Sequence, residues 1–298
     1  MTLQAKDRET TRPVNVDVWY PAASSAREVV LNYRTGSRGL AAPDAAPLEE
    51  QTALVLVSPG DSGSATAYSW LGEGLARQGF VVAGVSHGAE DSSWQRPGDC
   101  SAALDAVLAD PRFEHVADAG RIGAIGHAEG GAAVIALAGA TFDAEAMSRY
   151  CRSAEASGDR ACAHWERSGG KPARGTSGSF RDDRVRAVVA MDPFFGPGHD
   201  AQSLSLIRVP VLIIGCVDND FLPFAHHAGR YARLIPGASL TPLAHGEGHF
   251  VFVDDCFEER SVQGVPVCRD RNGVLRGTVH VKLLERVRRF FNEHLEPS

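Results

Sequence analysis

The stretch that decides the fold is Gly126-His127-Ala128-Glu129-Gly130-Gly131. Residues 121–125 before it predict a short buried strand, and the small apolar residues 131–137 after it predict a helix. A strand, a Gly-x-x-x-Gly turn and a helix are the setting of a nucleophile elbow, where a sharp turn exposes one side chain above a sheet. Ala128 occupies that position. Alanine has no nucleophilic atom, so the chain is either a natural pseudo-enzyme or an enzyme whose serine was removed on purpose.

Strand and helix patterns alternate along the rest of the 298 residues. Residues 14–20 alternate apolar and polar, as in a half-exposed strand near a sheet edge. Continuous apolar runs, typical of parallel strands covered on both faces, follow at 53–57, 80–85, 123–125, 187–191 and 211–214. Helices are predicted at 67–78, 101–109, 224–234 and over the last amphipathic stretch, which carries Leu284, Val287, Phe291 and Leu295 on one stripe. The pattern predicts one α/β domain over residues 1–298, with a doubly wound, mostly parallel sheet and helices on both faces.

Residues 143–184 interrupt this alternation. They are rich in Arg, Ser, Gly and Asp, with a helical pattern at 144–165 and a flexible loop predicted at 168–179. An insertion between a core helix and the next strand is where lids lie, and a lid shapes the choice of substrate. A solvated excursion without a role explains the same composition.

Composition and charge limit the partners. The net charge of −7 argues against nucleic acid and against an anionic membrane surface, and no apolar run is long enough for a membrane span. Residues 1–7 contain no apolar signal segment, which favours a cytoplasmic location. Two cysteine pairs, Cys151 with Cys162 and Cys256 with Cys268, have short spacings that suit disulfides and leave export open.

No metal or cofactor is predicted. Cys100 and Cys216 are expected to be single buried thiols, and no cysteine pair has the Cys-x-x-Cys spacing of a metal site. The Gly-rich segment 58–63 lacks the Gly-Lys-Ser/Thr ending of a phosphate-binding loop. The sequence indicates no oligomeric state.

His249 is the candidate general base. It lies in Gly246-Glu247-Gly248-His249-Phe250, after an apolar run predicted to form the last strand. A histidine beside glycines on such a loop can reach the elbow and take a proton from a nucleophile there. By contrast, His226, His227 and His245 are expected to be helix-face and loop histidines without a partner pattern.

Three aspartates are candidates for the acid that orients this histidine: Asp192, Asp218 and Asp220. Asp192 follows the strand predicted at 187–191, at a carboxyl end of the sheet where sites gather. The other two follow the next strand, where many hydrolases carry the acid four residues before a proline. The residue four before Pro223 is Asn219, and this mismatch favours Asp192. All three also have a structural explanation, because aspartate forms turns before proline and caps helices.

Two backbone N–H groups are expected to bind a developing oxyanion. One belongs to Glu129, directly after the nucleophile position. The other belongs to the loop Ser58-Pro59-Gly60-Asp61-Ser62-Gly63, where Asp61 is the expected donor through its main chain only.

Together these residues resemble the α/β-hydrolase superfamily, and within it the platelet-activating factor acetylhydrolases and related dienelactone hydrolase-like serine esterases. The similarity covers most of the chain, from Val18-Trp19-Tyr20-Pro21 through the elbow to Gly248-His249-Phe250 and Asp254. It implies an α/β-hydrolase fold and a cofactor-free serine hydrolase acting on short acyl esters, with relatives that cleave lactones, polyesters or amides. In such acetylhydrolases the acid follows the strand after the nucleophile helix, which is where Asp192 stands.

The sequence departs from this family at two places. The family serine is Ala128 here, and the family His-Gly pair before the oxyanion residue is Pro59-Gly60. Dienelactone hydrolases proper use a cysteine nucleophile, and no cysteine occupies the elbow either.

The leading hypothesis is a serine hydrolase that cleaves a carboxylic ester, lactone or amide through an acyl-enzyme and is inactivated by a Ser-to-Ala change at position 128. In the serine form the hydroxyl attacks the acyl carbon, His249 transfers the proton and Asp192 orients the imidazole. The alternative is a natural pseudo-hydrolase that binds a small molecule. A third hypothesis is a hydrolase-fold protein that uses His249 as the base in a reaction that needs no nucleophilic side chain. Four aromatic residues are expected near the site, as an acyl pocket or as core packing: Trp94, Phe194, Phe195 and Phe250.

Overall fold

The computed structural model describes residues 1–6, 12–23, 25–33, 35–60, 63–88, 93–167, 169, 178–256 and 259–296. Eight strands form the main sheet, in the order β1-β2-β6-β5-β7-β8-β9-β10. Their bounds are β1 Thr2–Lys6, β2 Pro13–Trp19, β5 Thr52–Ser58, β6 Val81–Ser86, β7 Ala117–His127, β8 Val185–Met191, β9 Val211–Cys216 and β10 Ser239–Leu243. All neighbours from β6 to β10 pair in parallel, whereas β1 and β2 join by antiparallel pairing. The prediction of a doubly wound, mostly parallel sheet is confirmed.

The predicted strands match the observed ones closely. The continuous apolar runs became central strands because residues on both faces are covered; every residue of β9, for example, is buried. β2 alternates exposed and buried residues and lies second from the edge, as its period predicted. β1 occupies the edge itself and was not predicted. β7 is longer than its apolar run, since it begins at Ala117.

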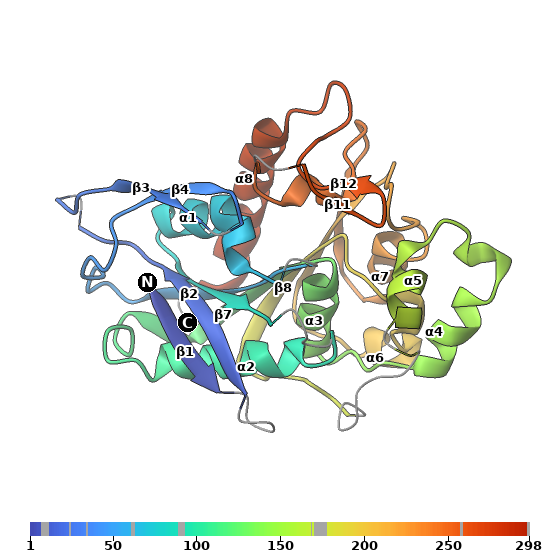
Figure 1. The fold of residues 1–298 in the computed structure, drawn as a ribbon. Coiled ribbons are helices and arrows are strands. Elements are labelled where there is room, and N and C mark those ends of the chain that lie inside the picture. The colour runs from blue at the N-terminus through green and yellow to red at the C-terminus, as the bar shows by residue number, and fades with distance from the viewer. Residues whose placement is uncertain are drawn as a thin grey trace.

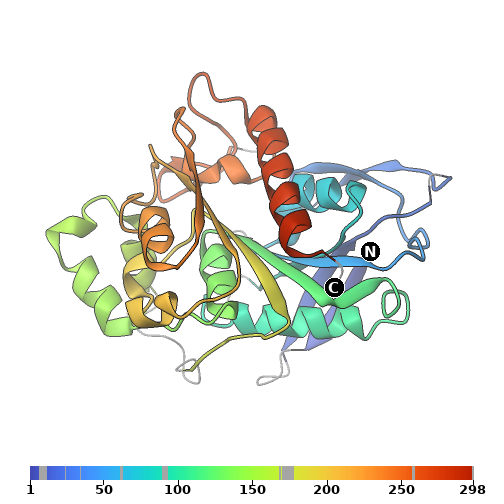
Figure 2. The same cartoon turned by 180° about the vertical axis from the view of Figure 1, so that it is seen from behind.

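Helices cover both faces of the sheet (Figures 1 and 2). They are α1 Ser69–Arg77, α2 Arg96–Leu108, α3 Glu129–Leu137, α6 Ala201–Ser205, α7 Ala228–Leu234 and α8 Arg276–His294, with short 3-10 turns η1 Ala65–Tyr68, η3 Gly196–Gly198 and η4 His249–Phe252. α1 and α8 pack with the apolar cluster on one face, and α2, α3, α6 and α7 with the cluster on the other. Burial from both sides holds the ends of the central strands in place.

Two predicted helices have different bounds in the structure. α2 begins at Arg96, five residues before the predicted start, with Pro97 in its first turn where a missing N–H costs nothing. α7 begins only at Ala228, because the preceding His227 has non-helical dihedral angles and bonds through Nε2 to Asp159 Oδ2 at 2.7 Å. The prediction that His227 lacks a partner is therefore wrong.

Three excursions leave the main sheet. The insertion after α3 contains α4 Ala144–Cys151, η2 Ala154–Ala156 and α5 Arg160–Arg167, so its helical half is confirmed; 168 and 170–177, most of the predicted loop, lie outside the described residues. The small hairpins are β3 Val29–Asn32 with β4 Arg38–Ala41, and β11 Ser261–Val262 with β12 Val265–Pro266. A lid role for 143–184 stays a prediction.

Both cysteine pairs whose spacing suits a disulfide are bonded. Cys151 bonds to Cys162 within the insertion, and Cys256 bonds to Cys268 around the β11–β12 hairpin. Each bridge closes one excursion on itself. Cys100 and Cys216 are buried free thiols, as predicted.

Among the described residues, none of the helices has the length and apolar character needed to cross a bilayer. The same part of the chain holds no cluster of three or more His, Cys, Asp or Glu side chains suited to a metal ion.

Candidate active site

Residues 126–131 form a tight strand–turn–helix at the carboxyl end of β7. Ala128 has φ 53° and ψ −116°, a left-handed conformation that costs a non-glycine residue free energy and persists only where the surroundings enforce it. A Cβ atom on Gly126 would lie 2.2 Å from the Gly130 carbonyl oxygen, and one on Gly130 would lie 2.1 Å from that of Ser58. Both positions therefore require glycine, and the turn presents the Ala128 methyl group where an elbow presents its nucleophile.

His249 and Asp192 meet beside this turn. Nδ1 of His249 lies 3.2 Å from Oδ2 of Asp192, and both side chains are buried. Burial lowers the pKa of His249 to about 3, so at neutral pH the imidazole is uncharged and can accept a proton. Phe221 stacks on the ring, with centroids 4.8 Å apart and planes at 14°. The structure thus brings together Ala128, Asp192 and His249, in the chain order predicted.

The Asp192 carboxylate is held by donors on both oxygens. The amide of Cys216 donates to Oδ1 at 2.8 Å, and the Asn219 side chain donates to Oδ2 at 2.7 Å. Burial nevertheless raises the pKa of Asp192 to about 6, which leaves it ionised at neutral pH. Asn219 occupies the position where many hydrolases carry the acid, and here it donates a hydrogen bond to Asp192, which follows the neighbouring strand.

The two alternative acids lie elsewhere. Asp218 is exposed, and the contact it makes is through its carbonyl oxygen, which accepts from Arg271. Asp220 Oδ1 accepts from the backbone amide of His249 at 3.0 Å, and its other oxygen lies 3.4 Å from Arg271. Asp220 thus positions the histidine loop, while the imidazole nitrogen faces Asp192.

The loop after β5, which is predicted to hold an oxyanion, is braced by a residue that sequence reasoning missed. Arg96 is buried at the start of α2; its Nη1 donates to the carbonyl oxygens of Pro59 at 2.8 Å and Gly60 at 3.3 Å, and its Nη2 to Glu129 Oε2 at 2.9 Å. One guanidinium therefore ties the loop after β5 to the first residue of α3. Asp61, the expected second donor, lies outside the described residues.

Glu129 is a buried, ionised carboxylate. Burial by itself raises its pKa, but the charge of Arg96 and the hydrogen bond from His164 hold the pKa well below the usual range. His164 Nε2 lies 2.8 Å from Oε1, which also accepts from the Ser93 hydroxyl. As the first residue of α3, Glu129 has no intrahelical partner for its amide, the group expected to face an oxyanion. No sequence motif marks Arg96, Ser93 or His164, because each lies in a segment predicted as loop or insertion.

A second network supports the elbow from the side of α1. His127 bonds through Nδ1 to the Tyr68 hydroxyl at 2.7 Å and through Nε2 to the His249 carbonyl oxygen at 3.0 Å. The Tyr68 hydroxyl accepts from the Gly60 amide at 3.0 Å. Burial lowers the pKa of His127, which keeps this relay neutral. The loop after β5, the turn at Ala128 and the turn that carries His249 are thus joined by buried hydrogen bonds.

The space above His249 is small and covered. A cavity of about 10 Å³ is lined by side chains from the elbow, the α5 insertion and the β11–β12 hairpin: Glu129, His164, Phe194, Phe221, His249, Phe250, Val262 and Gln263. Phe194 and Phe250 line it, as expected. Trp94 and Phe195 instead stack on each other, 5.2 Å apart, and line a separate cavity of about 30 Å³ beside α3.

Known proteins with similar sequences include cutinases and a lipase. No protein-family profile matches the chain. Cutinase est1 of Thermobifida alba is 34% identical over 197 residues, 65% of this chain and 51% of that protein, and Cutinase 2 of Thermobifida cellulosilytica is 33% identical over 194 residues, 64% and 57%. Lipase 1 of Moraxella sp. (strain TA144) is 24% identical over 66% of this chain and 47% of its own. The chain spans about half the length of these curated relatives.

A solved structure matches the whole chain. The ferulic acid esterase from Streptomyces cinnamoneus superposes with a TM-score of 0.68 at 23% identity, over 100% of this chain and 90% of that one. Together with the strand order, this match shows the α/β-hydrolase fold. Similarity to the acetylhydrolase and dienelactone hydrolase group stays a prediction.

Proposed function

We propose that this chain is a carboxylic ester hydrolase of the serine type whose nucleophile position holds alanine. The observation that carries the proposal is the buried His249–Asp192 pair beside the strained turn at Ala128. The cutinases and the lipase with similar sequences, and the esterase with the same fold, support an ester bond as the target. Lactones and amides are the further acyl substrates of this proposal.

In a form with serine at position 128, the roles follow from the contacts. Neutral His249 takes the hydroxyl proton as serine attacks the acyl carbon, and returns it to the leaving group. Ionised Asp192 holds the proton on Nδ1, so that Nε2 is the basic nitrogen. The amide of Glu129 and, as a prediction, that of Asp61 bind the oxyanion.

The chain with Ala128 supports a second candidate function. Without a hydroxyl it forms no acyl-enzyme, yet His249 and Asp192 remain hydrogen-bonded beside position 128. A natural pseudo-hydrolase that binds an ester-like small molecule has this arrangement, as does a hydrolase inactivated by replacement of its serine.

The deciding experiment is Ala128→Ser. We expect the serine form to react with a fluorophosphonate probe and to hydrolyse p-nitrophenyl acyl esters, because His249 is uncharged and hydrogen-bonded to Asp192 beside position 128. The parent chain should not be labelled. Its ester hydrolysis should exceed the uncatalysed rate by no more than about 10³–10⁴-fold, the catalysis that remains when a triad member is absent.

The matched control is Ala136→Ser, which adds a hydroxyl to a buried alanine further along α3. It should remain unlabelled. If the folded Ala128→Ser form neither labels nor turns over any ester, the hydrolase proposal is wrong and ligand binding becomes the function to pursue.

A further inference from the structure

A larger pocket lies beside the turn that carries His249. A pocket of about 580 Å³ is bounded by Gly248 and Phe250, the two neighbours of His249 in the chain, and by the hairpin residues 264–266. Arg160 of the insertion and the segment 269–272 complete it. This volume is in the range of small-molecule sites.

The pocket carries an excess of positive charge. Three guanidinium groups line it, those of Arg160, Arg269 and Arg271, together with the carboxylates of Asp220 and Asp270. Asp270 is paired with an arginine outside the pocket, so the three guanidinium groups of the lining are balanced by the carboxylate of Asp220 alone.

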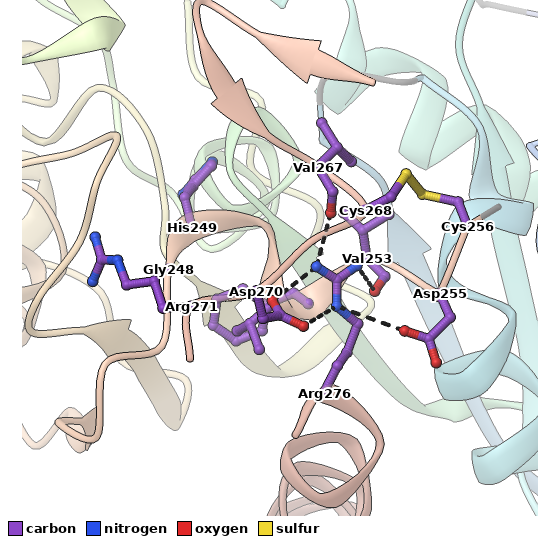
Figure 3. A network of polar contacts seen from close by, with 12 residues as sticks. Gly248, His249, Val253, Asp255, Cys256, Val267, Cys268, Asp270, Arg271 and Arg276 are labelled. Atoms are coloured by element: carbon purple, nitrogen blue, oxygen red, sulfur yellow. Dashed lines mark hydrogen bonds and ion pairs between the residues drawn. A yellow bond between two sulfur atoms is a disulfide. The ribbon is translucent and has the colours of Figure 1, made fainter. Parts of the chain in front are cut away.

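The arginine that pairs with Asp270 is Arg276. It lies outside the lining, and its Nε and Nη2 each donate to one oxygen of Asp270 at 2.9 Å. Figure 3 shows Arg276 reaching Asp270 from the start of α8, while Arg271 points away from this cluster. Asp220 is the carboxylate left in the pocket, 3.4 Å from Arg271.

Two of the cations retain donors for a ligand. Arg269 is exposed and makes no hydrogen bond or ion pair with the described part of the chain. Arg160 uses Nε to bond the Asp220 carbonyl oxygen at 3.2 Å and lies over the Phe221 ring, 5.9 Å from its centroid. Its terminal nitrogens make no hydrogen bond to the described residues. Such forked donors match a carboxylate in geometry as well as charge.

The remaining walls are apolar and held in place. Phe250 and Val265 are buried side chains of the lining, and Pro266 lies beside them. The base of the hairpin is fixed by the Cys256–Cys268 disulfide and by Arg276, which also donates to the Val267 carbonyl oxygen at 2.8 Å (Figure 3). An apolar wall beside guanidinium groups suits an organic anion better than a hydrated inorganic one.

We propose that this pocket binds a small organic carboxylate, with the anionic group between Arg269 and Arg160 and the apolar body against Phe250. The proposal does not depend on ester hydrolysis, because binding needs no nucleophile. Since the pocket is built on the two neighbours of His249, the carboxylate comes either from one end of the substrate or from a separate ligand.

The test titrates the parent chain with benzoate and with benzamide, its neutral isostere, by ligand-observed NMR. We expect benzoate to bind and benzamide to bind at least tenfold more weakly, with benzoate affinity falling as ionic strength rises. Arg269→Gln should weaken benzoate about tenfold, the size of one charge-assisted contact. Because Arg269 is exposed and makes no hydrogen bond or ion pair with the described residues, this variant should fold as the parent does.

The matched control is Arg289→Gln, an exposed arginine of α8 that pairs with Glu285 at 3.4 Å. It should leave benzoate affinity unchanged. Equal binding of benzoate and benzamide, or equal loss in both arginine variants, would overturn the proposal.

A second arm separates the two sources of the carboxylate. In the Ala128→Ser form, benzoate that raises KM without changing kcat occupies space that the ester needs, so the pocket holds one end of the substrate. Benzoate that changes kcat alone marks a separate ligand. If Ala128→Ser is inactive, the binding arm still tests the pocket.

Discussion

Two residues of the candidate site have backbone conformations that residues other than glycine rarely adopt. Ala128 has φ 53° and Asp192 has φ 39°. Both are joined through the same strand end, because the amide of Ala128 donates to the Met191 carbonyl oxygen at 3.0 Å. Strain of this kind is kept where surrounding contacts over-determine the backbone, and it clusters at functional sites. The Asp192 carboxylate in this conformation reaches Nδ1 of His249.

At this scale the acid can be tested directly. In the Ala128→Ser form, we expect Asp192→Asn to lower kcat for ester hydrolysis by about 10⁴, because an amide can favour the wrong imidazole tautomer. Asp218→Asn is the control, since that residue is exposed and the imidazole bonds to Asp192 instead. Steady-state kinetics decide; an equal loss in Asp218→Asn would contradict the assignment of Asp192.

Arg96 is the second residue to test. In the Ala128→Ser form, Arg96→Lys should slow fluorophosphonate labelling by about 10- to 100-fold and lower kcat with little change in KM, since oxyanion stabilisation acts in the transition state. Arg96→Met should also lower the free energy of unfolding by about 3–5 kcal/mol, because it removes the guanidinium that pairs with the buried Glu129 carboxylate and leaves His164 and Ser93 as its partners.

A double variant separates these two effects of Arg96. Arg96→Met with Glu129→Gln removes the buried charge, so chemical denaturation should show part of the stability restored. Labelling should stay slow, because the Pro59 and Gly60 carbonyls remain unbraced. Recovery of the labelling rate together with stability would mean that Arg96 is structural only.

Among the elements, the segment between η4 and α8 is held by several hydrogen bonds from a single side chain. Arg276 is buried at the start of α8 and donates to the carbonyl oxygens of Val253, Asp254 and Val267 as well as to Asp270 (Figure 3). It thus joins the histidine turn to the hairpin that covers it. The Cys256–Cys268 bridge closes the same excursion covalently.

Replacing Arg276 should therefore destabilise the protein through this segment. We expect Arg276→Met to lower the free energy of unfolding by about 3–5 kcal/mol, because the Asp270 carboxylate and several carbonyl oxygens lose their donor. Arg289→Met on the exposed face of the same helix should change it by less than about 0.5 kcal/mol. Urea denaturation compares the two; a similar small effect of both would show that the disulfide alone anchors the excursion.

For the whole molecule, buried neutral histidines make stability depend on pH. Burial lowers the pKa of His280 to about 4; its Nε2 bonds the Val251 carbonyl oxygen at 2.7 Å and its ring stacks on Trp70. The unfolded chain, with an ordinary histidine pKa near 6.5, binds protons more readily. Stability from this group is therefore present above about pH 6.5 and lost as the pH falls toward 4. Asp192 and Asp254, whose pKa values burial raises to about 6, act in the opposite direction.

The free energy of unfolding should fall between pH 6.5 and pH 4 by roughly 3 kcal/mol less in His280→Gln than in the parent chain, the equivalent of the pKa shift. Glutamine keeps a donor for the Val251 carbonyl oxygen but does not titrate. His115→Gln changes a side chain that is 88% exposed and should leave the pH dependence as it is. Unfolding free energies of the three proteins at both pH values give the answer; parallel curves would contradict the assignment to His280.

Local sequence determined the parts of this protein whose physics is local. Covered strands need continuous apolar runs, tight turns need glycine at Gly126 and Gly130, and short cysteine spacings close small loops; each is legible in a few neighbouring residues. The sheet, the turn at Ala128, both disulfides and the candidate pair Asp192 and His249 could therefore be predicted.

Contacts between distant segments were decided only by the tertiary structure. Arg96 connects the loop after β5 to the start of α3, and Asn219 donates a hydrogen bond to Asp192 after the neighbouring strand. His227 bonds to Asp159 of the insertion. The arginines of the cationic pocket come from positions 160, 269 and 271. None of these residues has a local pattern, since a buried hydrogen bond or a pocket wall is specified by position in space and not by spacing along the chain. Folding alone brings such groups within reach of each other, and burial then strengthens the contacts that they make.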